Sequence, residues 1–467
     1  MSVLPDQLNV VNVGLPMFAD ALRAQGVAVQ HVDWRIPAGG DATAVAMLSR
    51  LYGDEGSAVD AANQEVVRRL DSGLPQLVGV STVAQAMPEV TDRTLLHPGP
   101  PIEFDQVCDP LRRSMRAAVV AEGWATEVAE AQQLLARGDV ALEPANHHQT
   151  VVPMASAIGP SSPVFVMVDD VGGTCSYAPI SEGHSDVAWL GRDTDAAIER
   201  LRFIRDIAGP ALAQILSSAG SLDILHLVAL GISMSDDVHI RTQAATNELF
   251  RSWLPQLAEL PERHRYAMAC FLSDNHLFFL TLAMAAAKTL TLWAEQVSGS
   301  SIVTSMSRNG TTFGIKLAGS PQWYVTHALP VVDALYFPGY GLVDSALDIG
   351  DSAVLELVGL GGPAAAGSPA VTAFLGGSMA DARRTTEAYR QICVGTSSRF
   401  ILPPLEFTGT PIGIDVRRVV ELGITPQITT GILHASSGVG QVGVGAATAP
   451  LACFTEALTA LAARVDR

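Results

Sequence analysis

Apolar and polar positions in the first forty residues predict a βαβ unit. The apolar run LNVVNVG at 8–14 is typical of a strand, and Pro16 then opens an amphipathic stretch that ends at Gly26. Proline at the first helical position and glycine just past the last are common signals for the two ends of a helix. A second strand, VAVQHVDW at 27–34, follows. Because the first turn has no GxGxxG pattern, we interpret this unit as a structural scaffold.

The stretch SIVTSMSRNGTTFGIKL at 301–317 predicts a β-hairpin. Asparagine and glycine tolerate the positive φ of a tight turn, so Asn309 and Gly310 are expected at its centre. Large apolar residues then alternate with small or polar ones, as on a strand with one buried face. We expect the tip to contribute little to the core and to bind an anionic or amide-bearing ligand, although an ordinary hairpin explains the local pattern equally well. The candidate ligand-binding residues here are Arg308, Asn309, Gly310 and Lys316.

From Asp195 to about Leu292 the periodicity is mainly helical. Asp236 and Asp237 stand where an N-cap is expected, and a helix is predicted to follow directly. Polar residues on that helix would share one face, with Arg241 beside them. Because the face carries little charge, unlike most solvent-facing stripes, it predicts a lined cavity or an interface. Its members are His239, Thr242, Gln243 and Thr246.

A second helix is predicted from about Ser273 through the apolar run before Lys288. Asn275 and His276 would lie in its first turn, where free N–H groups favour an anion. Capping alone also accounts for both residue types.

The remaining candidate binding residues lie in loops. His147 and His148 are adjacent, and on a strand they would face opposite sides and could not both bind one metal, whereas in a loop they could. We expect one of them to be packed and the other solvated, and no metal site is predicted. Glu182 lies near the end of the predicted loop GGTCSYAPISEG at 172–183. Near the C-terminus Gly438, Gly440 and Gly443 spell GxGxxG beside His434, but the second strand and acidic residue of a dinucleotide site are missing. We expect these glycines to let backbone N–H groups approach a small ligand.

Length and composition limit the possible functions. A chain of 467 residues is expected to form two or three domains. We place three, at 1–140 (α/β), 196–295 (mainly helical) and 296–467 (α/β with the glycine-rich loop), with a β-rich connecting segment at 141–195. The fold class is therefore α/β to α+β. A net charge of −18 argues against nucleic acid as a partner. Charged residues make up only 16%, against about 25% in a typical protein, so we expect self-association or partner subunits.

The same features favour a soluble, cytoplasmic protein. The N-terminus has no basic start followed by an apolar run, so no signal peptide is predicted. The most apolar stretch, 277–287, is about half of the ~20 residues that span a bilayer. Five cysteines without a CxxC pair fit reduced thiols, and no cofactor is predicted.

Several blocks, in this order, resemble the YlbE-like family of bacterial proteins, which includes AllG-type subunits of oxamate carbamoyltransferase. They include NVVNVGLPMFADALRAQGVAVQHVDWRIPAGG at 9–40, NHHQTVVPMASAIGPSSPVFVM at 146–167, HIRTQAAT at 239–246, NHLFFLTLAMAAAK at 275–288 and SMSRNGTTFGIK at 305–316. The resemblance implies transfer of a carbamoyl group between oxamate or oxalurate and phosphate, in purine and allantoin breakdown. It also implies FdrA-like and AllH-like partner subunits.

The implied chemistry can be compared with the candidate residues. Carbamoyl phosphate is a dianion with an amide end, which suits cationic and amide partners. We assign His239 the proton transfer to or from the amide nitrogen, and count Arg241 and Asn309 with it as catalytic candidates. This chain differs from the residues typical of the family at Ile240, Thr242 and Ala435. Two alternatives stay open: hydrolysis or lysis of a small amide or ureido acid with His239 or His434 as base, and a non-catalytic scaffold subunit that binds ligand.

Overall fold

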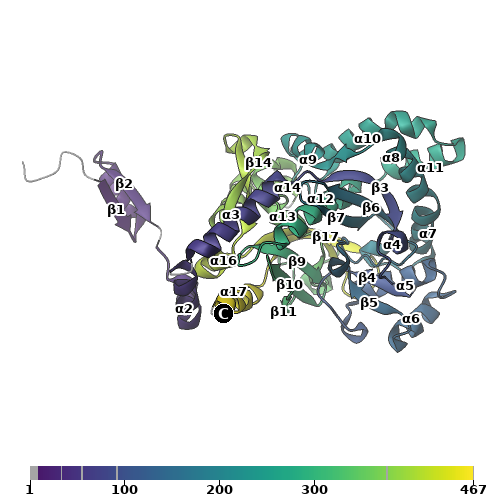
Figure 1. Ribbon diagram of the computed structural model, residues 1–467, viewed down its shortest axis with the longest axis horizontal. Helices are drawn as coiled ribbons and strands as arrows, with labels where there is room; N and C mark the ends of the chain where they lie inside the picture. Colours follow the sequence, from purple (N-terminus) through teal and green to yellow (C-terminus); the bar gives the residue numbers. More distant parts are fainter. Residues whose placement is uncertain (1–8, 33, 54–55, 91–92, 375–376, 466–467) are drawn as a thin grey trace, which may run out of the picture.

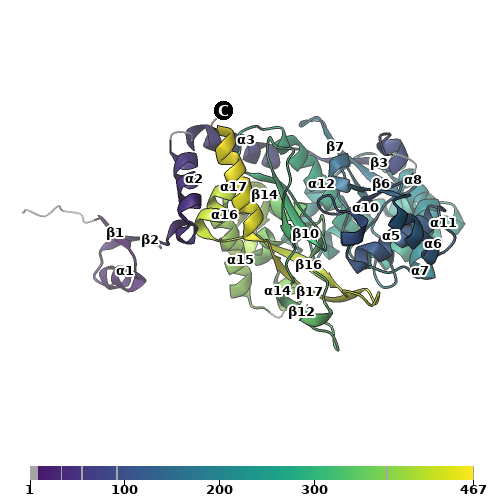
Figure 2. The same ribbon diagram turned by 90° about the horizontal axis from the view of Figure 1, so that it is seen from below.

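The structure, a computed structural model, describes residues 9–32, 34–53, 56–90, 93–374 and 377–465. It combines helices with several small sheets (Figure 1), so the predicted mixed α/β class is confirmed. A body of packed helices and sheets carries a small arm at its N-terminal end, and both views show the arm standing clear of it (Figures 1 and 2).

The arm is the predicted βαβ unit. Strands β1 (Asn9–Val13) and β2 (Ala28–Val32) pair in parallel and are joined by helix α1 (Pro16–Arg23). Leu8 and Asp33, which the sequence placed in these strands, lie outside the described residues. Apolar side chains of the arm remain exposed, including Met17 at 64% and Phe18 at 57%. A two-stranded parallel sheet this open buries too little apolar surface to be stable alone in water.

One half of the body is built on an antiparallel sheet in the order β7-β6-β3-β8. Helices α8 and α12 pack against it, and one hydrophobic cluster extends from Val66 to Leu433. The sheet takes strands from three of the four segments that the sequence suggested, because β3 pairs with both β6 and β8. Bounds are β3 (Gln76–Thr82), β6 (Pro163–Asp169), β7 (Thr174–Pro179), β8 (Leu222–Asp223), α7 (Asp195–Phe203), α8 (Gly209–Ala219), α9 (Ile224–Ser233), α10 (Gln243–Glu259), α11 (Glu262–Ser273) and α12 (Phe278–Glu295).

A small parallel pair lies beside this sheet, with two helices against it (Figure 1). It consists of β4 (Thr94–His97), β5 (Ala141–Pro144), α5 (Asp109–Ala121) and α6 (Val128–Arg137), and a short helix α4 (Val83–Ala86) follows β3.

The other half holds three further sheets, ordered β11-β10-β9-β13, β12-β17-β16 and β14-β15. Helices α2 and α3 from the N-terminal region pack here, so this half is not made by the C-terminal segment alone. Bounds are α2 (Ala42–Tyr52), α3 (Gly56–Ser72), β9 (Val303–Asn309), β10 (Thr312–Leu317), β11 (Tyr324–His327), β12 (Asp333–Tyr336), β13 (Ile349–Gly350), α13 (Val354–Leu357), α14 (Pro369–Phe374), α15 (Met379–Ile392), β14 (Cys393–Leu402), β15 (Thr408–Ile414), α16 (Val416–Leu422), β16 (Gln427–Leu433), β17 (Gln441–Thr448) and α17 (Leu451–Val465).

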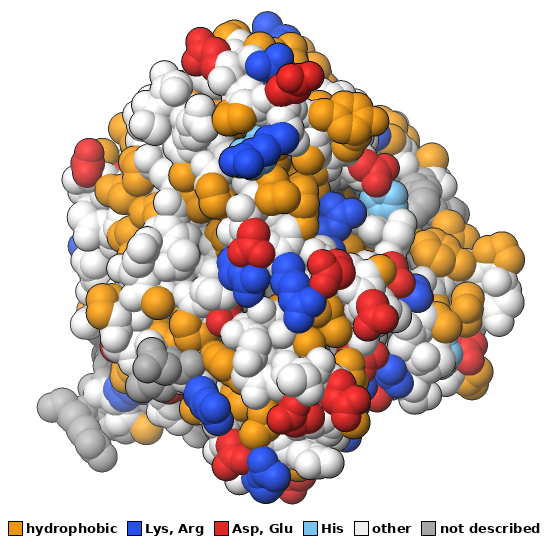
Figure 3. Space-filling model, turned by 90° about the vertical axis from the view of Figure 1, so that its right-hand side faces the viewer, with side chains coloured by type: hydrophobic (Ala, Val, Ile, Leu, Met, Phe, Trp, Pro, Cys, Tyr) orange, Lys and Arg blue, Asp and Glu red, His pale blue; other side chains and the backbone are white. Residues whose placement is uncertain are grey.

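No single helix among the described residues is long and apolar enough to cross a membrane. Helices α11 and α12 taken together are long and apolar enough for a broken membrane span, but they are bent by 80° relative to each other. Helix α12 is nonetheless buried along almost its whole length, in agreement with the prediction of a core helix. On the face shown in Figure 3, Lys and Arg side chains lie among Asp and Glu and form no single basic patch.

Candidate functional site

The loop between α9 and α10 presents both His239 and Arg241. The buried carboxylate of Asp237 holds it, accepting the backbone N–H of His239 at 3.1 Å and of Arg241 at 2.9 Å. Val238 has a φ of +59°, which is unfavourable for a β-branched residue. The surrounding contacts therefore maintain a strained backbone at this point, a feature often found at functional sites.

The helix predicted to begin directly after Asp237 starts at Gln243 instead, so His239 and Arg241 are loop residues and the predicted helical stripe is wrong. Asp236 still caps the helix, because its carboxylate accepts the N–H of Ala245 at 2.9 Å. The cap comes from outside the helix, which local sequence signals do not reveal.

His239 forms a buried pair with Glu356 of α13. Its Nδ1 donates to the Glu356 carboxylate at 2.7 Å, and the side chains are 4% and 0% exposed. Gly361, with a φ of +62°, packs against the pair so closely that a Cβ there would collide with the carboxylate. A carboxylate on Nδ1 fixes the ring orientation and leaves Nε2 as the proton acceptor. This is the geometry of an oriented general base.

His239 is one of the residues that line a cavity of about 60 Å³ where the two halves of the body meet. Trp189 and Leu280 come from the half built on β7-β6-β3-β8, and Thr430 and Gln441 come from β16 and β17. Two parts of the chain far apart in sequence therefore enclose the base. A cavity at such a junction is a common position for a small-molecule site.

Arg241 faces a neighbouring cavity of about 270 Å³, which His276 also lines. Its guanidinium lies 3.2 Å from the carboxylate of Asp236 and is 35% exposed. Burial raises the pKa of Asp236 to about 6, although Ala245 and the Arg241 charge favour its ionised form. Ile240 lines both this cavity and the one beside His239. The cationic group and the base are therefore separated by one residue.

The helix predicted from about Ser273 begins only at Phe278, so the placement of Asn275 and His276 in its first turn is also wrong. Asn275 instead exchanges hydrogen bonds with Ser181, accepting from its hydroxyl at 3.2 Å and donating to its carbonyl at 3.1 Å. The carbonyl of His276 accepts from the hydroxyls of Thr242 and Thr246 at 3.1 and 3.2 Å. The turn between α11 and α12 is thus tied to the start of α10.

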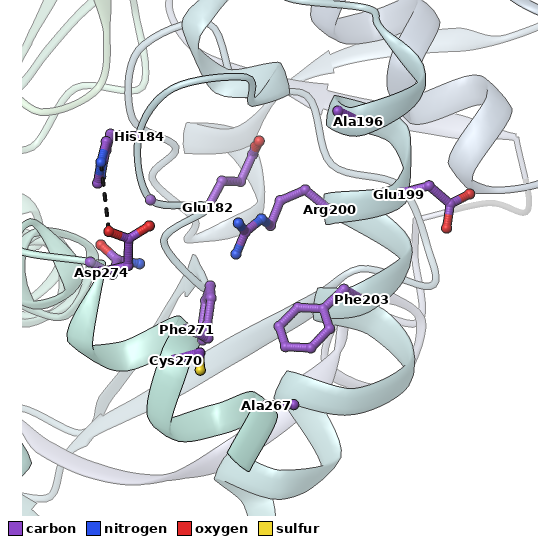
Figure 4. A pocket seen from close by; sticks show the side chains of 12 residues that line it. Glu182, His184, Ala196, Glu199, Arg200, Phe203, Ala267, Cys270, Phe271 and Asp274 are labelled. Atoms are coloured by element: carbon purple, nitrogen blue, oxygen red, sulfur yellow. Dashed lines mark ion pairs between the residues drawn. The ribbon is translucent and has the colours of Figure 1, made fainter. Parts of the chain in front are cut away.

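A third cavity, of about 440 Å³, also borders this turn (Figure 4). Asn275 and Glu182 line it, together with Arg200 of α7. The Glu182 carboxylate accepts the backbone N–H of Trp189 at 3.1 Å, and burial raises its pKa to about 7. Two predicted binding residues that are 93 positions apart in sequence therefore share one cavity.

The raised pKa of Glu182 predicts a pH-dependent stability. The folded protein keeps this proton up to about pH 7, whereas the unfolded chain releases it near its model value of 4.5. The associated stabilisation is therefore complete below about pH 4.5 and is lost as the pH rises through 7. We expect Glu182→Gln to gain stability relative to the wild type between pH 5 and pH 8, measured by urea unfolding. Glu199→Gln, at an exposed position of the same cavity, is the control, and equal shifts in both variants would contradict the prediction.

Arg308 is buried rather than exposed at a tip. Its guanidinium makes a bidentate pair with Asp348, at 2.7 and 3.1 Å, and donates to the carbonyl of Gly350 at 2.7 Å. Its side chain is 0% exposed. The expectation that this tip contributes little to the core is therefore wrong. A direct contact between Arg308 and ligand stays a prediction, and the hydrogen bonds shown here are structural.

The other hairpin candidates are also engaged by the protein. The turn is centred one residue later than predicted, on Gly310 (φ +79°) and Thr311, because Asn309 ends β9. The Asn309 side chain donates to Pro100 O at 3.1 Å and accepts the Thr311 N–H, which fixes the turn. Lys316 lies 5.1 Å from the Trp323 ring and is nearly buried. A catalytic role for Asn309 stays a prediction.

The two adjacent histidines have separate partners. His148 contacts the carboxylates of Glu89 at 3.1 Å and Glu143 at 2.5 Å, while His147 accepts the indole N–H of Trp323 at 3.1 Å. Across the described residues there is no group of three or more His, Cys, Asp or Glu side chains arranged to hold a metal.

The glycine-rich segment is the loop of the antiparallel hairpin β16–β17, not the turn of a dinucleotide site. Gly438 and Gly440 have φ values of +68° and +94°. The carbonyl of Val439 accepts a hydrogen bond from Arg192, and His434 Nδ1 accepts the N–H groups of Ser436 and Ser437 at 3.1 Å. The loop therefore contacts the other half of the body, and none of the cavities described above includes His434.

Comparison with known proteins gives the same fold in a solved structure. A conserved protein of unknown function from Enterococcus faecalis V583 matches with a TM-score of 0.85 and 32% identity, covering 87% of this chain and 98% of that one. The family profile described as "Oxamate carbamoyltransferase subunit AllG" matches residues 140–352. The oxamate carbamoyltransferase subunit AllG of Escherichia coli (strain K12) is 35% identical over 411 residues, 87% of this chain and 98% of that protein. The chain belongs to the AllG family. A second E. coli relative, the uncharacterized protein YahG, is 33% identical over 98% of each chain.

The segment that matches the AllG family profile contains His239, Arg241 and Asn275 but ends before Glu356. Sequence reasoning missed Glu356 and Arg200. The only local signal for Glu356 is a single acid within the apolar run AVLELVGLGG, which suggests a buried carboxylate in need of a partner. Nothing local distinguishes Arg200 from Arg202, the other arginine of α7.

Proposed function

We propose that this AllG-family chain is a subunit of a carbamoyltransferase that moves a carbamoyl group between oxamate or oxalurate and phosphate, with His239 as the acid–base residue. The observation that carries the proposal is the buried His239–Glu356 pair at a cavity between the two halves of the body, in a chain related to an oxamate carbamoyltransferase subunit. The substrates and the roles of individual residues are part of the proposal.

The reaction needs a base for a weak nucleophile. In the direction of oxalurate, the amide nitrogen of oxamate attacks the carbamoyl carbon of carbamoyl phosphate. The new N–C bond forms, the C–O bond to phosphate breaks, and the amide proton passes to Nε2 of His239. In reverse, protonated His239 returns that proton to the departing amide nitrogen while phosphate attacks. Arg241, one residue beyond Ile240, is placed to stabilise negative charge on the phosphate or the carbamoyl oxygen.

The test is reconstitution. The chain, purified alone and together with its partner subunits, is assayed for carbamoyl phosphate formation from oxalurate and phosphate. Activity that depends on both phosphate and partners supports the proposal. Release of ammonia without phosphate favours the hydrolase alternative, and full activity of the partners without this chain favours a scaffold role.

We assign the N-terminal arm to partner binding, with the FdrA-like and AllH-like subunits as the proposed partners. Its two-stranded parallel sheet has free edges, and Val11, Val13, Met17 and Phe18 are all more than half exposed. Apolar surface of this kind is usually covered in an assembly. A strand of a partner subunit paired with β1 or β2 would extend this sheet, and the partner's surface would cover these side chains.

We expect the double substitution Met17→Ser and Phe18→Ser to reduce co-purification with the FdrA-like subunit at least tenfold without lowering the melting temperature of the isolated chain. Burial of two such side chains at an interface is worth about 3 kcal/mol or more. Tyr266→Ser, at a 77% exposed position on α11, is the matched control. Unchanged co-purification would remove the arm from the interface.

A further inference from the structure

The cavity of about 440 Å³ is lined by one arginine, Arg200, whose charge acts on Glu182 and on two aromatic rings. Arg200 extends into it from α7, as Figure 4 shows. Its guanidinium lies 5.8 Å from the ring of Phe203 and 5.4 Å from that of Phe271. Within the described part of the chain it makes no hydrogen bond or ion pair that would occupy its N–H groups, whereas Arg202 on the same helix donates to Glu199 at 2.6 Å.

This environment leaves the Arg200 fork available to a ligand. Aromatic rings near a guanidinium hold it through cation–π attraction and do not compete for its in-plane N–H donors. A planar fork of five donors matches the two oxygens of a carboxylate, and partial removal from water strengthens that pairing.

Glu182 reaches the same cavity from the loop after β7 (Figure 4). One of its oxygens accepts the Trp189 N–H, and the Arg200 charge favours the ionised carboxyl across a separation longer than an ion pair. The two groups therefore face the space from separate points. A ligand between them would meet a cation at one end and a carboxyl group at the other.

Other acidic side chains of the cavity limit the charge of a ligand that could bind there. Glu199 and Asp274 also line the cavity and are exposed, and Asp274 lies 3.9 Å from His184. Arg202 pairs with Glu199 at 2.6 Å, so Arg200 is the arginine of the lining that is left to hold an anion. A single guanidinium beside Glu182 and Asp274 suits one negative charge better than a dianion such as phosphate. The same carboxyl oxygens are good acceptors for N–H donors.

We propose that this cavity is a binding site for a small monocarboxylate that also carries an amide, ureido or amino group. The carboxylate pairs with Arg200, and the N–H end donates to Glu182 or to Asp274 at the opposite side. The site is distinct from the cavity of His239, which does not line it. Only the choice of oxamate as the probe rests on the proposed function.

Asn275 connects this site with the neighbouring one. It lines the cavity and pairs with Ser181, while the next residue, His276, is held by Thr242 and Thr246 beside Arg241. A ligand on Arg200 therefore contacts the same turn that borders the Arg241 cavity. Such a position suits a substrate-sensing or regulatory site that responds to the amide acid.

The experiment is calorimetric titration of the full chain and of its His239→Gln variant with oxamate at pH 7.5. We expect a binding event, present in both, that Arg200→Met weakens about 10- to 150-fold, the effect of losing a charge-assisted hydrogen bond. Methionine keeps the packing against Phe203 and Phe271, so melting temperature verifies that the variant is folded. Arg202→Met on the same helix is the matched control and should bind oxamate as the wild type does.

His239→Gln separates this site from the proposed active site. Binding that survives His239→Gln and is weakened by Arg200→Met supports the inference, even if the reconstituted complex shows no carbamoyl transfer. Absence of oxamate binding to the wild type, or equal binding by Arg200→Met, overturns it. Binding lost only in His239→Gln also overturns it, because the ligand then occupies the other cavity.

Discussion

The His239→Gln variant is expected to lower kcat for carbamoyl transfer about 10²- to 10⁴-fold in the reconstituted complex, the usual contribution of a positioned acid–base group. Glutamine retains a polar side chain of similar reach but cannot take up the amide proton at neutral pH. Steady-state kinetics with oxalurate and phosphate, together with melting temperature, measure the effect. His434→Gln is the matched control, because none of the three cavities described here includes His434.

Glu356 is a positioning residue for the same proton transfer, and the kinetic effect expected of its substitution differs from that of His239→Gln. Glu356→Gln removes the charge that holds the Nδ1–H, so the wrong tautomer and a shifted pH profile of kcat are expected while KM changes little. A purely structural role would lower stability without moving the pH profile. Normal kinetics in His239→Gln would return the pair to a structural role, and a loss confined to His434→Gln would favour the alternative base.

Arg308→Met is expected to destabilise the protein by about 3–5 kcal/mol, because it leaves the carboxylate of Asp348 buried without its partner. Arg308→Lys keeps a charge but loses the bidentate geometry, so an intermediate loss is expected. Urea unfolding of the isolated chain measures both.

Two comparisons make the Arg308 result interpretable. Arg251→Met removes an arginine from an exposed pair with Glu248 on α10 and should change the unfolding free energy little. If Arg308→Lys instead lowers kcat/KM while unfolding normally, the fully paired arginine in this structure would have to exchange partners during catalysis. That result would restore the original substrate-binding prediction.

The sequence by itself determined the local elements of this protein. Pro16 and Gly26 bound a helix between two strands, and the 301–317 alternation produces β9 and β10. The apolar run at 277–287 forms a buried helix. These features follow from backbone preferences and from side-chain periodicity, which act over a few residues and are visible without tertiary contacts.

Only the tertiary structure decided which polar residues contact one another and which form structural hydrogen bonds and ion pairs inside the protein. His239 and Glu356 are 117 positions apart, and the cap of α10 comes from Asp236 across a strained loop. Arg308 looked like a free donor at a hairpin tip, yet the neighbouring strand β13 and Asp348 enclose it. Burial and long-range pairing depend on how distant segments pack. The residue type alone therefore does not show whether a charged side chain forms an ion pair within the protein or is available to bind a ligand.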